Sequence, residues 1–541
     1  MKLTFIGADH EVTGSCHLLT AAGRSILIDY GMEQGRNIFE NAPLPIPASE
    51  IDAVFVTHAH IDHTGLLPLL GARGFRGRVY ATAATCDLCD IMLLDSAGIQ
   101  QFEAEWRNRK GRRKGLPPFV PLYTAEDVDR IMRCFVPCPY DKVIDVFDGI
   151  RIRFNDAGHL LGSAAIEVWA KEQGKETKIV FSGDVGNHDQ PILKEPKKID
   201  SADYLLIEST YGDRSHGERP DYRTALAEVI QRTLDRGGNV VIPSFAVGRT
   251  QEMLYIIREI KAEKLVHGHD GFPVYVDSPL ATRATGIFNE HYTDCFDGEA
   301  QALIAEGINP ITFPGLKLAL TTDESRAINE DGTPKVILSA SGMCEAGRIK
   351  HHLKHNLWRP ESTVLFVGYQ ANGSLGREIL EGEKEVTLFG ETIRVQAEIV
   401  SLKGISGHAD REGLLDWASG FRKKPKRVFV VHGEDGVEQS FCALLHEKLG
   451  LQAEAPYSGT VWNLTDNVCE KKTEGVPFVR LDAEGHPLPA AASTKATPYL
   501  RLEHTADRLR SLVRALKGRP NKELAQMADQ LAKALRTALH E

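Results

Sequence analysis

The chain contains the stretch Thr57-His58-Ala59-His60-Ile61-Asp62-His63, which places four metal-ligating side chains within six residues directly after the apolar run AVFV. The apolar run predicts a strand, so the four side chains lie in the loop at the end of that strand. His58 and His60 are two positions apart and can project toward one ion, while the turn beyond them brings Asp62 and His63 to a neighbouring point. This density of ligands favours two metal centres over a surface loop that is rich in histidine by chance.

Further candidate ligands stand where other predicted strands end, namely His159 in DAGHLLGS, Asp184 in FSGDVG, His408 in SGHAD and His432 in VVHGE. Each alone is a weak signal, because a single histidine after a strand is more often a structural residue. They become significant as a group, because we expect them to lie near the HAHIDH motif at one sheet. Together these side chains supply enough ligands for two zinc ions.

Two cysteine pairs offer an alternative metal site. Cys86 and Cys89 are separated by two residues, and Cys134 and Cys138 by three. The first pair lies on an apolar stretch that predicts a helix, and no histidine accompanies either pair. The pattern favours free buried thiols over a separate zinc clip.

The pattern of secondary structure changes twice along the chain. The first 200 residues read as short strands separated by turn residues, which predicts a sheet-rich α/β layer structure. From about Tyr211 helices and strands alternate, with helices expected at 220–236 and 248–262, and this alternation is typical of a parallel sheet. Short strands return after about residue 385. The return predicts that a second domain is inserted into the first.

Composition places the chain among globular proteins. Its 541 residues predict roughly two to four folded units, and 42% hydrophobic with 26% charged residues is typical of a soluble globular protein. The amino terminus lacks the apolar stretch of a signal peptide, nine cysteines form no dense framework, and no run of about 18 apolar residues occurs. We therefore expect a cytoplasmic protein without a membrane span. The net charge of −10 decides nothing about local contacts.

At these motifs the chain resembles a known family. HAHIDH, His159 and Asp184 are similar to the ordered motifs of the metallo-β-lactamase fold, and Asp29 in LIDYG is similar to its first motif. Three later segments resemble the extra motifs of the β-CASP branch, namely IESTYG around Glu208, GHAD around His408 and VHGE around His432. That branch includes ribonuclease J and the endonuclease subunit of the eukaryotic cleavage and polyadenylation factor. The resemblance covers roughly residues 1–465.

The resemblance implies an α/β fold in which a metallo-β-lactamase αββα sandwich carries an inserted β-CASP parallel α/β domain. The predicted boundaries are 1–208 for the first part of the sandwich, 209–385 for the insertion and 386–465 for the second part. Residues 466–541 are a C-terminal extension, in which a linker precedes two predicted helices. We expect those helices to form a docked pair or a homodimer contact.

The resemblance also implies a role for each candidate side chain. Two Zn²⁺ ions per chain would be bound, one by His58, His60 and His159 and the other by Asp62, His63 and His432. Asp184 would bridge the ions, which activate a water for attack on phosphorus. His408, held by Glu208, would protonate the leaving 3′ oxygen, and Asp29 would support a ligand from outside the metal site. The implied catalytic set is therefore Asp62, Asp184, Glu208 and His408.

Further segments are similar to the family and would line a cleft between the domains. Short Ser/Gly loops at strand ends present backbone N–H groups to phosphates, so Ser341, Gly342 and Ser374 are candidates for holding single-stranded RNA. Arg249 in SFAVGRTQE is a fourth candidate. Ordinary turn chemistry is the alternative for each of them.

A basic run in this otherwise acidic protein holds six cations within eight residues: Arg107, Arg109, Lys110, Arg112, Arg113 and Lys114. Phosphate contacts supply most of the nonspecific affinity of proteins for RNA. The run is therefore a candidate RNA-binding segment, with a solvated surface loop as the alternative.

Other functional classes fit the chain less well. A β-lactamase or thioester hydrolase shares HxHxDH but has no need of a βα insertion followed by GHAD and VHGE. DNA-processing members of the β-CASP branch typically have valine where this chain has His432, which favours RNA over DNA. A noncatalytic RNA-binding scaffold is disfavoured because every expected ligand is present. The sequence leaves open whether cleavage is internal or proceeds from the 5′ end.

Overall fold

The computed structural model describes residues 1–35, 37–112, 118–217, 220–371, 373–402 and 404–478, together with two short strands, β24 Arg480–Leu481 and β25 Pro487–Leu488. The chain divides into two compact units, Met1–Val476 and Pro477–Glu541. The two helices predicted for the C-terminal extension lie outside the described residues. Among the described residues, no helix combines the length and the apolar character needed to cross a membrane.

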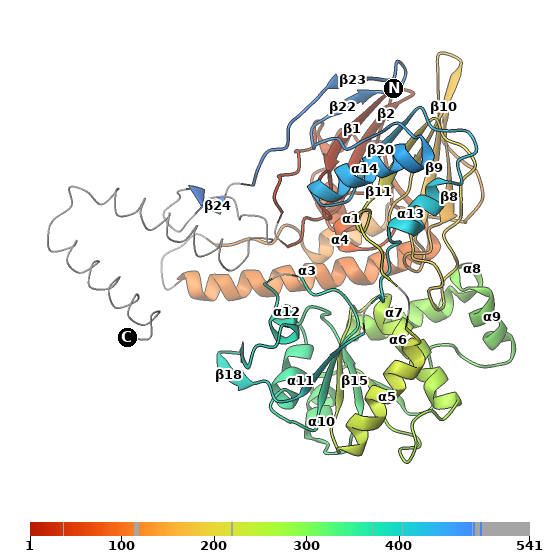
Figure 1. The fold of residues 1–541 in the computed structure, drawn as a ribbon. Coiled ribbons are helices and arrows are strands. Elements are labelled where there is room, and N and C mark those ends of the chain that lie inside the picture. The colour runs from red at the N-terminus through yellow and green to blue at the C-terminus, as the bar shows by residue number, and fades with distance from the viewer. Residues whose placement is uncertain are drawn as a thin grey trace, which may run out of the picture. The chain divides into compact units, whose positions relative to one another are not determined.

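Two sheets form a sandwich in the first unit (Figure 1). The first sheet has the order β23-β22-β1-β2-β3-β4-β5-β6, with the strands β1 Lys2–Gly7, β2 Cys16–Ala21, β3 Arg24–Ile28, β4 Ala53–Phe55, β5 Arg78–Thr82, β6 Phe135–Cys138, β22 Val461–Asn463 and β23 Val468–Lys471. The second has the order β21-β20-β11-β10-β9-β8-β7, with the strands β7 Ile144–Phe147, β8 Ile150–Asp156, β9 Ala164–Glu172, β10 Lys175–Phe181, β11 Tyr204–Glu208, β20 Arg427–Val431 and β21 Ala453–Glu454.

Alternation along each strand divides its side chains between two cores. In β4, Phe55 faces the core between the sheets, whereas Val54 faces the helices on the outside. The outer face of the first sheet is covered by α2 Leu67–Ala72, α3 Ala83–Arg112 and α4 Ala125–Met132. The outer face of the second sheet is covered by α13 Arg411–Ala418 and α14 Asp435–Leu449. The layers are therefore αββα, and the predicted fold class is confirmed.

A third sheet, parallel throughout, forms the inserted domain. Its order is β14-β13-β15-β12-β16-β19, with the strands β12 Val240–Pro243, β13 Val274–Val276, β14 Leu316–Leu318, β15 Val336–Ser339, β16 Thr363–Phe366 and β19 Glu398–Ser401. The helices of this domain are α5 Tyr222–Asp235, α6 Arg249–Ala262, α7 Pro279–Glu290, α8 Tyr292–Cys295, α9 Gly298–Ala305, α10 Thr322–Glu330, α11 Ile349–Asn356 and α12 Leu375–Leu380. Of these, α5 and α6 lie where the sequence predicts helices.

The strands that follow residue 385 differ from the sequence pattern. There, β17 Glu385–Leu388 and β18 Glu391–Arg394 form a separate hairpin, while β19 joins the inserted sheet beside β16. The inserted sheet thus extends past residue 385. Glu398 pairs with Thr363, and partners this far apart in sequence leave no local pattern that indicates which sheet a strand joins.

The helix α3 connects the sandwich to the inserted domain. Leu88 and Leu93 of α3 lie in the same buried cluster as Phe288 of α7, and His291 Nε2 lies 2.6 Å from Asp87 Oδ2. Figure 1 shows α3 running between the two sets of sheets. The inserted domain is therefore held by a continuous apolar core as well as by its two connections to the sandwich.

Candidate metal centre

The motif residues follow the ends of strands in both sheets of the sandwich. The HAHIDH loop follows β4, His159 follows β8, Asp184 follows β10 and His432 follows β20, while Glu208 is the last residue of β11. Because β10, β11 and β20 are parallel, their carboxyl ends meet at one edge. Side chains as far apart in sequence as 369 residues are thereby brought into contact.

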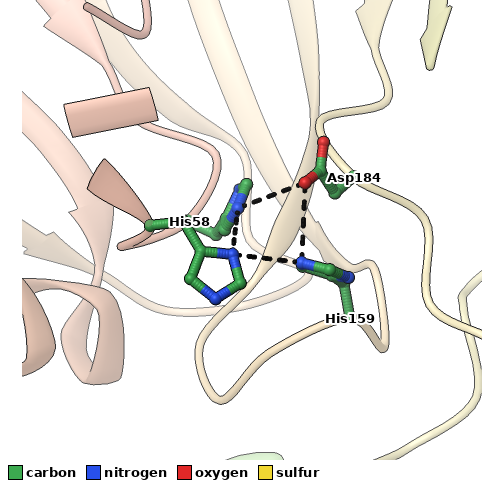
Figure 2. Close-up of side chains that lie close together, drawn as sticks. His58, His159 and Asp184 are labelled. Carbon is green, nitrogen blue, oxygen red and sulfur yellow. Dashed lines mark hydrogen bonds and ion pairs between the residues drawn. The ribbon is translucent and has the colours of Figure 1, made fainter. Parts of the chain in front are cut away.

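His58, His60, His159 and Asp184 form the first cluster, with one ligand atom of each within 4.8 Å of the others. His60 Nδ1 lies 3.0 Å from His58 Nε2 and 3.2 Å from His159 Nε2. Figure 2 shows His58 and His159 turned toward Asp184, whose Oδ2 atom is 3.4 Å and 3.5 Å from their Nε2 atoms. A tetrahedral zinc ion with bonds of about 2.0–2.1 Å holds its ligand atoms about 3.3 Å apart, so this spacing fits one ion.

Asp62, His63 and His432 form the second cluster. His432 Nε2 lies 3.2 Å from His63 Nε2 and 3.6 Å from Asp62 Oδ2. Asp184 Oδ1 faces this cluster, 3.3 Å from His63 Nε2, and this oxygen is buried without a hydrogen-bond donor. Such an oxygen fits contact with a cation. The side chains present therefore fit a metal site, with one oxygen of Asp184 facing each cluster.

Burial keeps the histidines of the first cluster in the form that can bind metal. It lowers the pKa of His58 and His159 well below the usual value and also lowers the pKa of His60, so these imidazoles are neutral. Neutral imidazole has the lone pair that zinc requires. Burial raises the pKa of Asp62, but a hydrogen bond with His432 and nearby positive charge outweigh it and lower that pKa to about 2. Asp62 is therefore ionised.

Hydrogen bonds fix which ring nitrogen faces the metal. Asp29 Oδ2 lies 2.7 Å from His63 Nδ1, and Thr57 N donates to Asp29 Oδ1 over 2.8 Å. The Nδ1 atom of His159 lies 3.0 Å from the carbonyl oxygen of Gly407. In both histidines Nδ1 is engaged, so Nε2 is left for the ion. Asp29 lies where a residue that supports a ligand is expected.

Backbone hydrogen bonds hold the turn that carries Asp62. Ser15 N donates to Asp62 O and Tyr30 N donates to His63 O, each over 2.8 Å. At Gly31, between these contacts, a Cβ atom would lie 1.6 Å from Asp62 O. The close approach of two backbones therefore requires glycine at this position.

His408 and Glu208 form a pair beside the first cluster. The oxygens of buried Glu208 accept hydrogen bonds from the backbone N–H groups of Val185 at 2.7 Å and Thr210 at 3.1 Å. His408 Nδ1 lies 3.1 Å from Glu208 Oε1 and 3.8 Å from Asp184 Oδ2. The His408 side chain is 22% exposed, whereas His58 and His63 are buried. His408 is therefore accessible to a substrate.

The candidate phosphate-binding Ser and Gly residues lie in loops at the carboxyl ends of the inserted strands. Ser341 and Gly342 follow β15. Ser374 caps α12, where its side chain accepts a hydrogen bond from Arg377 N over 3.2 Å. Their contact with RNA stays a prediction.

Arg249 is engaged by protein groups on both sides. Its guanidinium is 10% exposed, forms an ion pair with Glu252 at 2.5 Å and donates to the carbonyl oxygen of Ile405 over 3.1 Å. Arg249 thus links α6 to the segment that leads to His408. Its part in RNA binding also stays a prediction.

The described part of the basic run lies at the exposed end of α3 and consists of Arg107, Arg109 and Lys110. Arg107 pairs with Glu103 at 2.6 Å, and Lys110 lies 3.7 Å from the ring centre of Trp106. The remaining cations fall outside what the structure describes, namely the Arg112 side chain, Arg113 and Lys114. The described cations are positioned in solvent, where a polyanion can reach them.

Two supporting groups escaped the sequence analysis. One is the Gly407 carbonyl at His159, and the other is Thr210, whose Oγ1 atom lies 3.2 Å from His432 Nδ1. Both belong to motifs already singled out, SGHAD and IESTYG, but nothing in those motifs indicates the partner. The nine cysteines are free, and none belongs to a metal-ligating group among the described residues.

Known families and proteins resemble the chain over most of its length. Three family models match: the metallo-β-lactamase superfamily at 11–120, the Beta-Casp domain at 250–379 and the Zn-dependent metallo-hydrolase RNA specificity domain at 392–456. Ribonuclease TTHA0252 of Thermus thermophilus is 39% identical over 80% of this chain and 94% of its own length. Transcription termination factor FttA of Methanosarcina mazei is 32% identical over 84% of this chain and 70% of its own length.

The sandwich and its clustered ligands define a metal-dependent hydrolase of the metallo-β-lactamase class. The inserted parallel domain and the RNA specificity domain narrow that class. The chain belongs to the β-CASP family of metallo-β-lactamase RNA nucleases. The family predicted from HAHIDH, GHAD and VHGE is thus confirmed.

Replacing Gly31 should disturb the metal site through the backbone. In Gly31→Ala the new methyl group meets Asp62 O, so we expect a loss of about 1–3 kcal/mol in the free energy of unfolding together with weaker zinc binding. Urea denaturation and zinc analysis measure both. The control is Gly286→Ala in α7, where a Cβ atom meets nothing within 4 Å and stability should hold or rise by about 0.5–1 kcal/mol. Equal losses in the two variants would contradict the backbone contact.

Removal of a ligand should lower the bound zinc. We expect both His60→Ala and Asp184→Ala to abolish RNA cleavage. Asp184→Ala should weaken the binding of both zinc ions, because the oxygens of Asp184 face both clusters. Elemental analysis of the purified variants gives the zinc content per chain. His269→Ala, which removes a surface histidine paired with Asp235 at 2.8 Å, serves as the control. Unchanged zinc and full activity in both site variants would overturn the assignment.

Proposed function

We propose that the protein is a ribonuclease that uses two zinc ions to hydrolyse phosphodiester bonds of single-stranded RNA. The observation that carries this proposal is the orientation of the Asp184 carboxylate, whose two oxygens face separate ligand clusters. The RNA specificity domain at 392–456 and the name of the Thermus relative support RNA as the substrate. The cut is internal, at the 5′ end, or both, since either uses the same metal chemistry.

The ligand set suits a phosphodiester anion. When bound, two zinc ions supply Lewis-acid chemistry that lowers the pKa of a water and offsets charge on the phosphate. The seven ligands include only two carboxylates, Asp62 and Asp184, so the charge of two divalent cations is only partly neutralised. The remaining positive charge attracts the substrate.

His408 is placed to donate a proton. Burial lowers the pKa of His408, but the carboxylates of Glu208 and Asp184 outweigh burial and raise it to about 9. Because Asp184 would share its charge with the cations, Glu208 is the partner that keeps the imidazole protonated. Nδ1 faces Glu208, so Nε2 is the atom that gives its proton to the leaving 3′ oxygen.

Substrate end groups test the proposed activity. The zinc-loaded protein is incubated with three forms of the same single-stranded RNA: one with a 5′-monophosphate, one with a 5′-triphosphate and one closed into a circle. Cleavage of the circle shows internal cutting, and cleavage restricted to the monophosphate shows a 5′ exonuclease. Failure to cleave all three, with two zinc ions bound, would refute the proposed function.

Loss of His408 should slow the chemistry and leave the metals in place. We expect His408→Ala to retain two zinc ions and bind RNA while its rate falls about 10²–10⁴-fold, the usual contribution of a positioned acid. A substrate with sulfur in place of the scissile 3′ oxygen has a leaving group that needs little protonation, so it should largely restore the rate. Loss of one zinc per chain, or no rescue by sulfur, would place the acid elsewhere.

Glu208→Gln provides a second readout of the same step. The acid works only while His408 is protonated, so activity falls as pH rises through its pKa. Removing the Glu208 charge lowers that pKa, and the alkaline limb of the kcat profile should move to lower pH. An unmoved limb would contradict the role of Glu208.

The basic run should contribute to RNA affinity through phosphates. Replacing its six Arg and Lys residues by Ser should weaken binding and reduce the slope of log K against log salt by up to about 4, because fewer counterions are released. Fluorescence anisotropy in a His408→Ala background measures binding without rapid cleavage. Arg326→Ser with Arg394→Ser removes two exposed cations of the inserted domain as a control. An unaltered slope would show that the basic run is a solvated surface loop that does not contact the phosphates.

A further inference from the structure

Two large aromatic side chains are exposed at the carboxyl edge of the inserted sheet. Phe245 follows β12 and is 50% exposed, and Tyr369 follows β16 and is 57% exposed. The strands β12 and β16 are adjacent and parallel, so both rings lie beyond the same edge. Single exposed aromatic residues are common on protein surfaces, and the significance of this pair depends on its surroundings.

Phe245 lies next to the metal loops. The residues after it, Ala246 and Val247, are buried in one cluster with Ala59 of the HAHIDH loop and Leu160 of the His159 loop. A Cβ atom at Gly248 would lie 3.2 Å from Leu160 Cδ1, which shows how closely the two loops approach. The loop that carries Phe245 is therefore fixed against the loops that carry the metal ligands.

The segment of Tyr369 is tied to the loop that contacts Phe245. The Nε2 atom of buried Gln370 donates to the carbonyl oxygens of Gly342 over 2.9 Å and Tyr369 over 3.1 Å. A Cβ atom at Gly342 would lie 3.3 Å from the Phe245 ring, so one short loop touches both aromatic positions.

Tyr211 lies close to the proposed acid. Burial raises the pKa of Tyr211, and the phenol of Tyr369 adds to this effect. The ring of Tyr211 in turn lies 6.2 Å from that of His408, centre to centre. The two exposed rings therefore lie beyond one edge of the inserted sheet, and the loop of Phe245 packs against the loops that carry the candidate ligands.

We infer that Phe245 and Tyr369 form a stacking platform for the nucleobases next to the scissile phosphate. This inference rests on the proposed function. The metal ligands and His408 act on the phosphate and contact no base in that mechanism, so base recognition needs further groups. Aromatic rings accept the face of any base, which gives affinity without sequence preference.

The platform also determines the form of RNA that fits. Bases in a duplex are already stacked on their neighbours, whereas unpaired bases can splay out onto protein rings. The rings project among short loops that contain Ser341, Gly342 and Gln370. The pair is thus a specificity element for single-stranded RNA.

Kinetics with modified enzyme and modified RNA test the platform. Phe245→Leu and Tyr369→Leu should raise KM for a single-stranded RNA about 5- to 100-fold, the range for loss of one stacked base, with a smaller change in kcat. Phe245→Tyr and Tyr369→Phe keep a ring and should restore KM. The matched control is Trp358→Leu, which removes a 54% exposed ring between α11 and β16, at the opposite edge of the same sheet.

The second part of the experiment uses RNA with an abasic ribose on one side or the other of the scissile bond. The abasic position should raise KM of the wild-type enzyme by a similar factor. On the same abasic RNA, the Leu variant that lacks the ring facing that position should show no further rise in KM, because ring and base form one contact. No effect of either abasic position on the wild type would overturn the inference without depending on how any variant folds. Equal losses for the Leu variants on intact and abasic RNA would overturn it as well.

The outcomes separate this inference from the proposed function. A wild-type protein that binds two zinc ions and cleaves no RNA refutes both. A wild-type protein that cleaves RNA, with KM unchanged in Phe245→Leu and Tyr369→Leu, refutes the platform alone. A rise in KM for Trp358→Leu equal to that of the Leu variants at the platform would also contradict it, since that ring lies at the other edge of the sheet.

Discussion

The carboxylate of Asp184 sets the constraint that the rest of the structure meets. A buried, ionised oxygen without a donor is costly unless cations compensate it, and Asp184 has histidine clusters on both sides that can hold them. For its oxygens to lie 3.4 Å from His58 and 3.3 Å from His63, strand ends from two different sheets have to be placed closely. The packed core between those sheets, which includes Phe55, Phe181 and Phe429, provides the rigidity.

The inserted domain takes part in the site because its loops are built into the same core. The cluster that joins α3 to α7 also contains the residues after Phe245 and those around His159. Arg249 connects α6 to the carbonyl of Ile405, three residues before His408. The sandwich therefore carries the clustered histidines and carboxylates, and loops of the inserted domain pack against the loops that contain them. A net charge of −10 is compatible with this arrangement, since the charge of the whole chain does not describe the local charge at one site.

Much of the fold follows from local patterns. Alternation of apolar residues indicates the sandwich strands, and the helices expected at 220–236 and 248–262 correspond to α5 and α6. The placement of β19 does not follow from such patterns, because its four residues resemble the short strands of the sandwich and only pairing with β16 puts them in the inserted sheet. The short strands β17 and β18 follow from the sequence pattern, but their pairing as a separate hairpin does not, for the same reason.

The sequence by itself determined which side chains are candidate metal ligands, through their dense spacing in HAHIDH and the separate motifs that contain His159, Asp184 and His432. Tertiary structure decided which oxygen of Asp184 faces which cluster, that Gly407 orients His159, and that Phe245 and Tyr369 are exposed beside the site. The physical reason is one of range. Residue type and spacing act over a few positions and are written locally, whereas a hydrogen-bond partner or an exposed face depends on segments hundreds of residues away, which meet only when the sheets have formed.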